Sequence, residues 1–174
     1  MMTLDLAVAI VDGALAKGAA IDCDPLTVAV LDAEGELMVQ GTYSVPVFMG
    51  TAPPTLRLML EKIPAEQLRP GDVVMTNDPW IGTGHIYDIN VMRPVFAGDK
   101  IIAYVISITH LPDVGGLGFG ASAEEIYHEG LRIPVSKFFD RGKVNELLSA
   151  IKLVKSNAWQ STFKERITKS REEE

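Results

Sequence analysis

The sequence predicts an α+β fold, in which a mostly antiparallel sheet has helices at both ends and one β-hairpin carries a metal site. Short runs rich in β-branched and aromatic residues are separated by turn residues, which is typical of hairpins. Amphipathic helical patterns occur near both ends of the chain. A His-x-x-Asp signature occurs twice, at residues 85–88 and 110–113, on either side of the longest pair of predicted strands.

Composition restricts the classes of function. The chain has 174 residues, of which 47% are hydrophobic and 22% are charged, as expected for one globular domain with a substantial core. Its net charge of −7 argues against a nucleic-acid partner. No apolar run reaches the length of a membrane span and no signal peptide is recognisable, so we expect a cytoplasmic protein without a membrane partner. The single cysteine, Cys23, excludes an internal disulfide.

Two helices are predicted in the first half of the chain. The first covers Leu4–Gly18, with Thr3 as its N-cap and Gly18 as a stop signal. Its predicted buried face comprises Leu4, Ala7, Val8, Val11, Ala14 and Leu15. The second covers Thr51–Ile63, where two prolines fit the first helical turn. Its predicted buried face comprises Leu56, Met59, Leu60 and Ile63.

The remaining elements follow from β-rich runs and turn residues. The predicted strands are Leu26–Leu31, Leu37–Gln40, Val73–Met75, Ile89–Phe96 and Ile101–Ile108. A glycine-rich loop at 115–120 predicts a close backbone approach to the metal site or to a partner chain. A helix is predicted over Asn145–Lys155, and its apolar residues are expected either to pack on the sheet or to be covered by another chain.

The central hairpin gathers candidate metal ligands. With a two-residue turn at 98–99, counting outward places Asp88 opposite Thr109 and Tyr87 opposite His110. The open end of the hairpin therefore collects the two imidazoles and two carboxylates of the paired signatures. Imidazole nitrogens and carboxylate oxygens are ligands of divalent transition metals. The prediction depends on register, because a one-residue slip turns alternate side chains to the other face.

Each of these residues also has an ordinary structural interpretation. An isolated histidine more often forms structural hydrogen bonds than binds a metal, and an aspartate near a turn is usually a cap or an Asx-turn former. Asp78, which precedes Pro79 in a loop, either forms a turn or lines a substrate pocket beside the metal. The pairing of the two signatures gives the metal-binding and structural interpretations equal weight.

Several segments resemble the hydantoinase B family, which includes the metal-bearing subunits of N-methylhydantoinase, 5-oxoprolinase, acetone carboxylase and acetophenone carboxylase type enzymes. These segments are Arg69–Trp80, Gly84–Asp88, Thr109–Gly116 and Glu125–Pro134. The resemblance implies a domain over residues 1–157, followed by a charged helical tail over residues 158–174. Family members are much longer than this chain, so it corresponds to their N-terminal part, either as a fragment or as one piece of a split subunit.

The resemblance also implies roles for particular residues. In the acetone carboxylase branch, a Mn ion is held by a histidine, an aspartate shortly after it, and a second histidine after the hairpin, positions that fall on His85, Asp88 and His110. The implied site is a two-histidine, one-carboxylate centre for Mn or Zn, with Fe as a third option. Asp113 is implied to orient His110 and, with Asp78, completes the candidate catalytic set. No ligand role is implied for the third histidine.

Three functions from different classes remain open. The first is the metal-bearing part of an ATP-dependent carboxylase or amidohydrolase that acts on a small carbonyl or cyclic amide substrate. There, the resemblance implies that ATP is bound by a hydantoinase A-like ATPase subunit within a hetero-oligomer, and the metal triplet slightly favours carboxylation. The second is a non-catalytic scaffold or binding subunit of such a complex. The third is a haem or small-ligand sensor, because residues 25–33 resemble a small GlcG/HbpS-type domain, although most of the chain argues against it.

Overall fold

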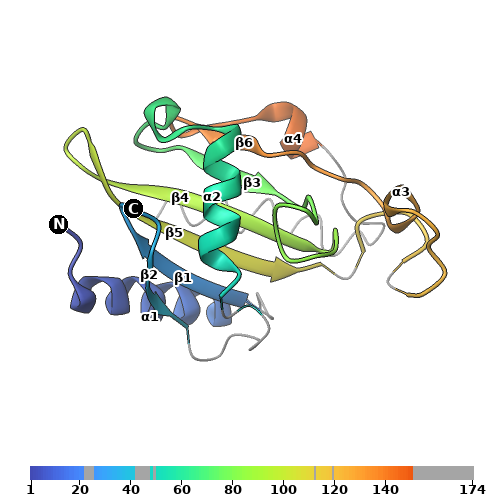
Figure 1. Cartoon of the computed structure of the whole chain (residues 1–174), viewed down its shortest axis with the longest axis horizontal. Helices are drawn as coiled ribbons and strands as arrows, with labels where there is room; N and C mark the ends of the chain where they lie inside the picture. The colour runs from blue at the N-terminus through green and yellow to red at the C-terminus, as the bar shows by residue number, and fades with distance from the viewer. Residues whose placement is uncertain (22–25, 42–47, 49, 112, 119, 151–174) are drawn as a thin grey trace.

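The computed structural model describes residues 1–21, 26–41, 48, 50–111, 113–118 and 120–150. Within them, a seven-stranded sheet with strand order β2-β1-β5-β4-β3-β6-β7 forms the centre of the molecule (Figure 1). The strands are β1 Leu26–Asp32, β2 Leu37–Gln40, β3 Val73–Thr76, β4 Asp88–Ala97, β5 Lys100–His110, β6 Ser136–Asp140 and β7 Lys143–Val144. The neighbouring strands in this sheet pair antiparallel, which confirms the predicted α+β class with a mostly antiparallel sheet.

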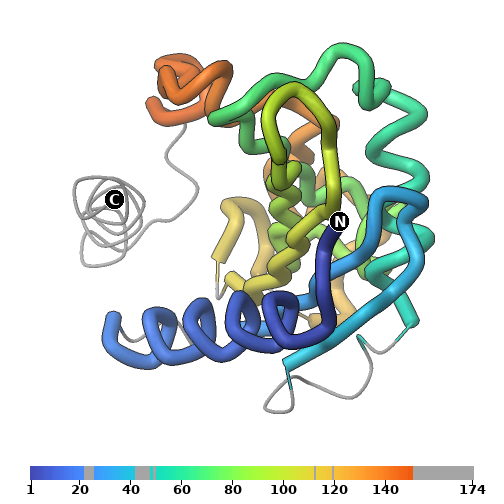
Figure 2. The backbone as a smooth tube through the Cα atoms, turned by 90° about the vertical axis from the view of Figure 1, so that its left-hand side faces the viewer, coloured from blue at the N-terminus to red at the C-terminus, as the bar shows by residue number. Residues whose placement is uncertain are grey.

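Two helices cover opposite faces of the sheet. In Figure 2, α1 (Leu4–Ala20) and α2 (Ala52–Lys62) lie on different sides of the strands. Successive residues of a strand point to opposite faces, so Leu31 packs in the core beneath α2 whereas Val30 packs in the core beneath α1. The shorter helical elements are η2 Ala65–Gln67, α3 Ile126–Glu129 and α4 Glu146–Ala150. Strand β1 is apolar at each position from Val28 to Leu31, and these residues are buried on both faces of the sheet.

The predicted helix starts agree with the structure. The Thr3 hydroxyl accepts a hydrogen bond from the Leu6 backbone N–H at 3.3 Å, which confirms Thr3 as the N-cap of α1. Helix α1 continues past the predicted stop at Gly18 for two more residues. Helix α2 carries proline in its first turn, and Leu56 and Met59 are fully buried, as predicted.

The predicted buried face of α1 is only half correct. Ala7 and Val11 are buried, but Leu4 and Val8 are 58% and 40% exposed. The prediction for Leu4 and Val8 was wrong because α1 packs on β1 and on β2, the edge strand. The surface of α1 that contacts these strands is narrower than the apolar face of the helix, so part of that face stays exposed.

A β-bulge lies just beyond the turn of the β4–β5 hairpin. Phe96 pairs with Ile101, but the next residue of β4, Val95, pairs with Ala103. Ile102 is therefore an extra residue in β5. From this point to the open end of the hairpin, the register is shifted by one residue from the predicted one.

This shift changes which residues meet at the open end. Asp88 lies directly opposite His110. The predicted pairs, Asp88 with Thr109 and Tyr87 with His110, are wrong because counting evenly from the turn misses the extra residue in β5. Bulges give little sequence signal when, as here, the residues around them are ordinary β-formers.

Strands β6 and β7 were not predicted, and Asp72 attaches them to β3. The Asp72 carboxylate lies 2.7 Å from the Lys137 ammonium and accepts hydrogen bonds from the backbone N–H groups of Arg141 at 2.7 Å and Arg69 at 2.9 Å. Burial alone would raise the pKa of Asp72, but these contacts outweigh it and hold the pKa below its ordinary value of 3.8. A buried carboxylate thus joins two segments that are far apart in the sequence.

Some predictions lie outside the described residues. They are the charged tail, the boundary at 157/158, the end of the helix predicted over Asn145–Lys155, and Cys23. The described start of that helix is α4, in which Leu147 is 76% exposed. Among the described residues, no helix is both long and apolar enough to cross a membrane.

Candidate metal centre

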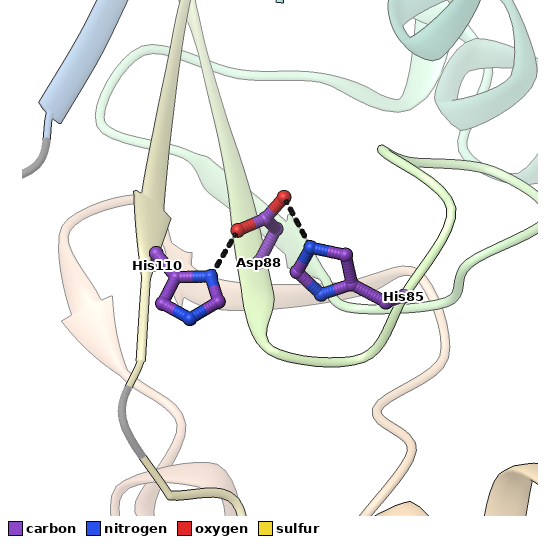
Figure 3. A group of neighbouring side chains, drawn as sticks. All are labelled: His85, Asp88 and His110. Carbon is purple, nitrogen blue, oxygen red and sulfur yellow. Dashed lines mark hydrogen bonds and ion pairs between the residues drawn. The ribbon is translucent and has the colours of Figure 1, made fainter. Parts of the chain in front are cut away.

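Three side chains converge at the open end of the β4–β5 hairpin (Figure 3). The Asp88 carboxylate lies between two imidazoles, with Oδ1 3.0 Å from His110 Nδ1 and Oδ2 3.3 Å from His85 Nε2. One ligand atom from each residue can be chosen so that all three lie within 4.8 Å of one another. The structure thus brings together the three residues that the sequence nominated as metal ligands.

The sheet and one loop position these side chains. Asp88 is the first residue of β4 and His110 is the last residue of β5, so the ladder holds them face to face. His85 belongs to the loop of residues 77–87 that joins β3 to β4. Two candidate ligands are therefore fixed by strand pairing, whereas the position of the third depends on how this loop is held.

Asp88 is fully buried and well provided with partners. Besides the two imidazoles, the Thr83 hydroxyl donates a hydrogen bond to Asp88 Oδ2 at 2.6 Å. A buried carboxylate is costly unless hydrogen bonds or positive charges compensate it, and these groups supply that compensation. The two imidazoles are about one third exposed, at 32% for His85 and 34% for His110, so the centre opens to solvent on their side.

The Tyr87 ring packs against the rings of His85 and His110. Its ring is stacked with that of His110 at a centroid distance of 5.9 Å and an interplanar angle of 25°. The phenol is buried, and burial, with the negative charges of Glu129 and Asp113, raises its pKa. Its hydroxyl donates to the Glu129 carbonyl at 3.2 Å. Tyr87 is thus a neutral, hydrogen-bonded support for His110.

Asp78 lies in the same loop, with both carboxylate oxygens engaged. Oδ1 accepts a hydrogen bond from the Trp80 backbone N–H at 3.1 Å, and Oδ2 pairs with the Arg132 guanidinium. This guanidinium lies over the Trp80 ring, 5.5 Å from its centroid. The Asp78 carboxylate therefore forms a turn and anchors Arg132 at the same time. Trp80 is 68% exposed and lines an open pocket of about 390 Å³ together with Gly84, the residue before His85.

Asp113 and His128 lie outside the cluster. Asp113 Oδ1 accepts a hydrogen bond from the Gly115 backbone N–H at 2.7 Å, as an Asx-turn former does. His128 faces Glu125 at 3.3 Å in the α3 region. A Cβ on Gly116 would collide with the backbone of residues 128–130, so within the described chain the glycine-rich loop closely approaches that segment and not the cluster of His85, Asp88 and His110. Its predicted approach to a partner chain stays a prediction.

Sequence reasoning missed three residues that shape the centre. They are Thr83, which bonds Asp88; Asn77, which bonds the backbone beside His85; and Arg132, which pairs with Asp78. Thr83 offered one weak signal, as a single hydroxyl between two glycines shortly before the His-x-x-Asp signature. The partners of Asn77 and Arg132 include residues 54 or more positions away, which no local pattern reports.

The residues present fit a divalent transition metal. Two imidazoles and one carboxylate form a donor set used for Zn, Mn and non-haem Fe, and one side of the cluster is open to solvent. The buried carboxylate also makes a cation favourable at this position.

An antiparallel α+β domain with a two-histidine, one-carboxylate cluster at a hairpin end defines a candidate metal-binding domain. A family model described as hydantoinase B/oxoprolinase matches residues 22–171, and the chain belongs to this family. An uncharacterized protein of Methanocaldococcus jannaschii is 38% identical over 129 residues, which cover 71% of this chain. The caprolactamase subunit beta of Pseudomonas jessenii is 31% identical over 140 residues, which cover 79% of this chain. In both cases the match spans 23% of the relative's length.

Two solved structures share the fold. The ATP-dependent caprolactamase of Pseudomonas jessenii superimposes with a TM-score of 0.73 and 25% identity, covering 93% of this chain and 31% of that chain. A nucleotide-free acetone carboxylase gives a TM-score of 0.69 and 21% identity, covering 97% of this chain and 25% of that chain. The fold is thus that of one part of much longer chains.

Proposed function

We propose that this chain is the metal-binding part of a subunit in a cytoplasmic, ATP-dependent amidohydrolase or carboxylase complex. The observation that carries the proposal is the cluster of His85, Asp88 and His110 at the open end of the hairpin, in a chain of the hydantoinase B/oxoprolinase family. A divalent ion, Mn or Zn before Fe, is the proposed occupant.

Cyclic amide hydrolysis is the reaction we propose first, and ketone carboxylation second. Sequence relatives with named activities include a caprolactamase subunit, which matches most of this chain. The similarity to acetone carboxylase is a similarity of fold, at 21% sequence identity. The slight preference for carboxylation, which came from the metal triplet alone, is therefore reversed in this proposal.

The chain's own residues hold and orient the proposed centre. The Thr83 hydroxyl holds the Asp88 carboxylate between the two imidazoles, and the Tyr87 ring stacks on His110. A divalent ion in this position supplies Lewis-acid chemistry, activating water and stabilising negative charge on a carbonyl oxygen. Asp78 is proposed to act through Arg132, whose guanidinium it holds over Trp80 beside the pocket.

ATP is proposed to bind on a partner, a hydantoinase A-like ATPase subunit, with further chains in a hetero-oligomer. The glycine-rich loop at 115–120 lacks the Lys-Ser/Thr pair of a phosphate-binding loop. The caprolactamase relative is named as a beta subunit. Native mass spectrometry of the complex co-purified from its source cells tests this arrangement. Recovery of the chain without an ATPase subunit would contradict it.

Metal analysis tests the centre itself. The purified chain should contain or bind one equivalent of Mn, Zn or Fe, and His85→Ala and His110→Ala should each lose most of it. The chain has three histidines, so His128→Ala is the matched control and should retain the metal. Full metal content in the His85→Ala and His110→Ala proteins would refute the proposal.

A second candidate is a non-catalytic scaffold subunit. Asp88 already has partners for both oxygens, so the cluster can act as a structural network without an ion. This function is supported if the chain joins the complex, binds no metal, and loses stability in the His110→Ala variant. Asp113→Asn tests the role proposed for Asp113 beside His110. It preserves the turn at Gly115, so a change in metal affinity would indicate that Asp113 orients His110.

A further inference from the structure

A row of buried polar residues follows strand β3. Thr76, Asn77 and Asp78 are 0%, 1% and 4% exposed, respectively. Burying three consecutive polar side chains is costly unless each one is hydrogen-bonded, and each of them is. What these hydrogen bonds connect therefore indicates why the row is buried.

Asn77 connects two separate segments through its side-chain amide. Its Nδ2 donates to the Ile86 carbonyl at 2.8 Å and to the Leu131 carbonyl at 2.8 Å, and its Oδ1 accepts from the Ile133 N–H. Ile86 directly follows His85. One side chain thus ties the backbone beside a metal ligand to the segment of residues 131–133.

The three ligands differ in how they are held. Asp88 and His110 are held by the β4–β5 ladder, which does not involve Asn77. The loop that carries His85 has internal hydrogen bonds, from Gly82 N to the Asp78 carbonyl and from Tyr87 N to His85 Nδ1. The bond from Asn77 to Ile86 reaches across this loop from its first residue. Loss of that bond should therefore move His85 relative to the other two ligands.

We propose that Asn77 is a positioning residue that sets the place of His85 in the metal centre. The inference rests on the proposed function, because it concerns the same site. Asn77 does not touch the ligand atoms itself; it acts through the backbone of Ile86. The role differs from general stabilisation, because it predicts a loss of metal affinity out of proportion to the loss of stability.

Thr76 provides a matched comparison. Its hydroxyl donates to the Ile133 carbonyl at 2.8 Å, so it bonds the same distant segment as Asn77 and is equally buried. The same hydroxyl accepts a hydrogen bond from the Asp78 N–H, and neither bond reaches residues 85–86. Thr76→Val therefore weakens the attachment to residues 131–133 without cutting the link to His85.

The experiment measures Zn²⁺ affinity and unfolding free energy for the full chain and its N77D and T76V variants. N77D keeps an acceptor for Ile133 but sets a carboxylate oxygen against two carbonyls. We expect N77D to weaken Zn²⁺ binding by about 10-fold or more, as removal of outer support for a metal ligand does. T76V should lose comparable stability while its Zn²⁺ affinity stays within about 2-fold of wild type, because neither bond of the Thr76 hydroxyl reaches residues 85–86. If N77D does not fold, N77A, which removes the amide without adding repulsion, takes its place.

A double-mutant cycle with H85A separates the positioning of His85 from a general loss of stability. If Asn77 acts through His85, N77D adds little to the loss of Zn²⁺ affinity already caused by H85A. Wild-type affinity in N77D, an equal loss in T76V, or full additivity with H85A would each overturn the inference and leave the proposed function standing. A wild-type chain that binds no Zn²⁺, Mn²⁺ or Fe²⁺ would overturn both.

Discussion

Asp88 and His110 face each other directly across the β4–β5 ladder, with Asp88 Oδ1 3.0 Å from His110 Nδ1. This pairing exists because β5 contains one residue more than β4 between the turn and the open end, namely Ile102 in the bulge. Without the bulge, His110 would lie one position further along and its side chain would turn to the other face of the sheet. A feature near the turn thus determines which residues meet at the opposite end of the hairpin.

Deletion of Ile102 should therefore disrupt the candidate metal centre. Removing the extra residue restores even pairing and moves His110 away from Asp88, so Zn²⁺ affinity should fall by at least about 10-fold. Isothermal titration of the deletion variant, with circular dichroism as a check of folding, measures this. Ile102→Val keeps the chain length and should bind as wild type does. Unchanged affinity in a folded deletion variant would mean that the register is set elsewhere.

Gly82→Ala should disturb the loop that carries Thr83 and His85. A Cβ at residue 82 would collide with the side-chain amide of Asn90, which is buried in β4, so either the loop or this side chain has to shift. We expect a loss of about 1–3 kcal/mol of stability from this overpacking. Thermal unfolding and Zn²⁺ titration measure the two effects. Gly120→Ala is the control, because a Cβ there meets no atom within 4 Å; an equal effect at both glycines would contradict the steric explanation.

Asp72→Asn should destabilise the attachment of β6 to β3 by about 1–3 kcal/mol at neutral pH, because it removes the charged partner of Lys137. The folded-state pKa of Asp72 is below its ordinary value of 3.8, so its stabilising contribution is complete above that value. The contribution is lost as the pH falls through the folded-state pKa. The difference between wild type and variant should therefore shrink in acid, as measured by urea unfolding at a series of pH values. Asp140→Asn tests a contact of Lys137 at 3.6 Å from a 64% exposed carboxylate and should have a smaller effect.

Asp78→Asn should separate the turn-forming role of this residue from its charge. The amide can still accept from the Trp80 N–H, but the ion pair with the 36% exposed Arg132 is lost. We expect only a small loss of stability, because solvent screens the exposed Arg132 side of this ion pair. Release of Arg132 from the Trp80 ring should also change the tryptophan fluorescence. Activity of the assembled complex is the decisive measurement, because a variant with unchanged activity and stability has no need of the charge.

Local signals in the sequence were sufficient for the parts of the fold that local contacts decide. The Thr3 cap, the prolines of α2 and the turn of the central hairpin each depend on residues within a few positions, and each was predicted correctly. The candidate ligands His85, Asp88 and His110 were also identified, because residue type and spacing around a hairpin are visible in the chain itself.

The exact geometry of the site was decided by the tertiary structure. The bulge that sets Asp88 against His110 depends on how β4 and β5 pack. No residue near the bulge indicates in the sequence that β5 contains an extra residue. The bonds of Asn77 to residues 131–133 and of Asp72 to Lys137 join segments more than fifty residues apart, so they form only when the sheet brings those segments together. By itself, the sequence determined which chemical groups this protein offers near the hairpin end. Packing of distant segments decided how those groups face one another, because side-chain direction follows register and register is a property of the whole sheet.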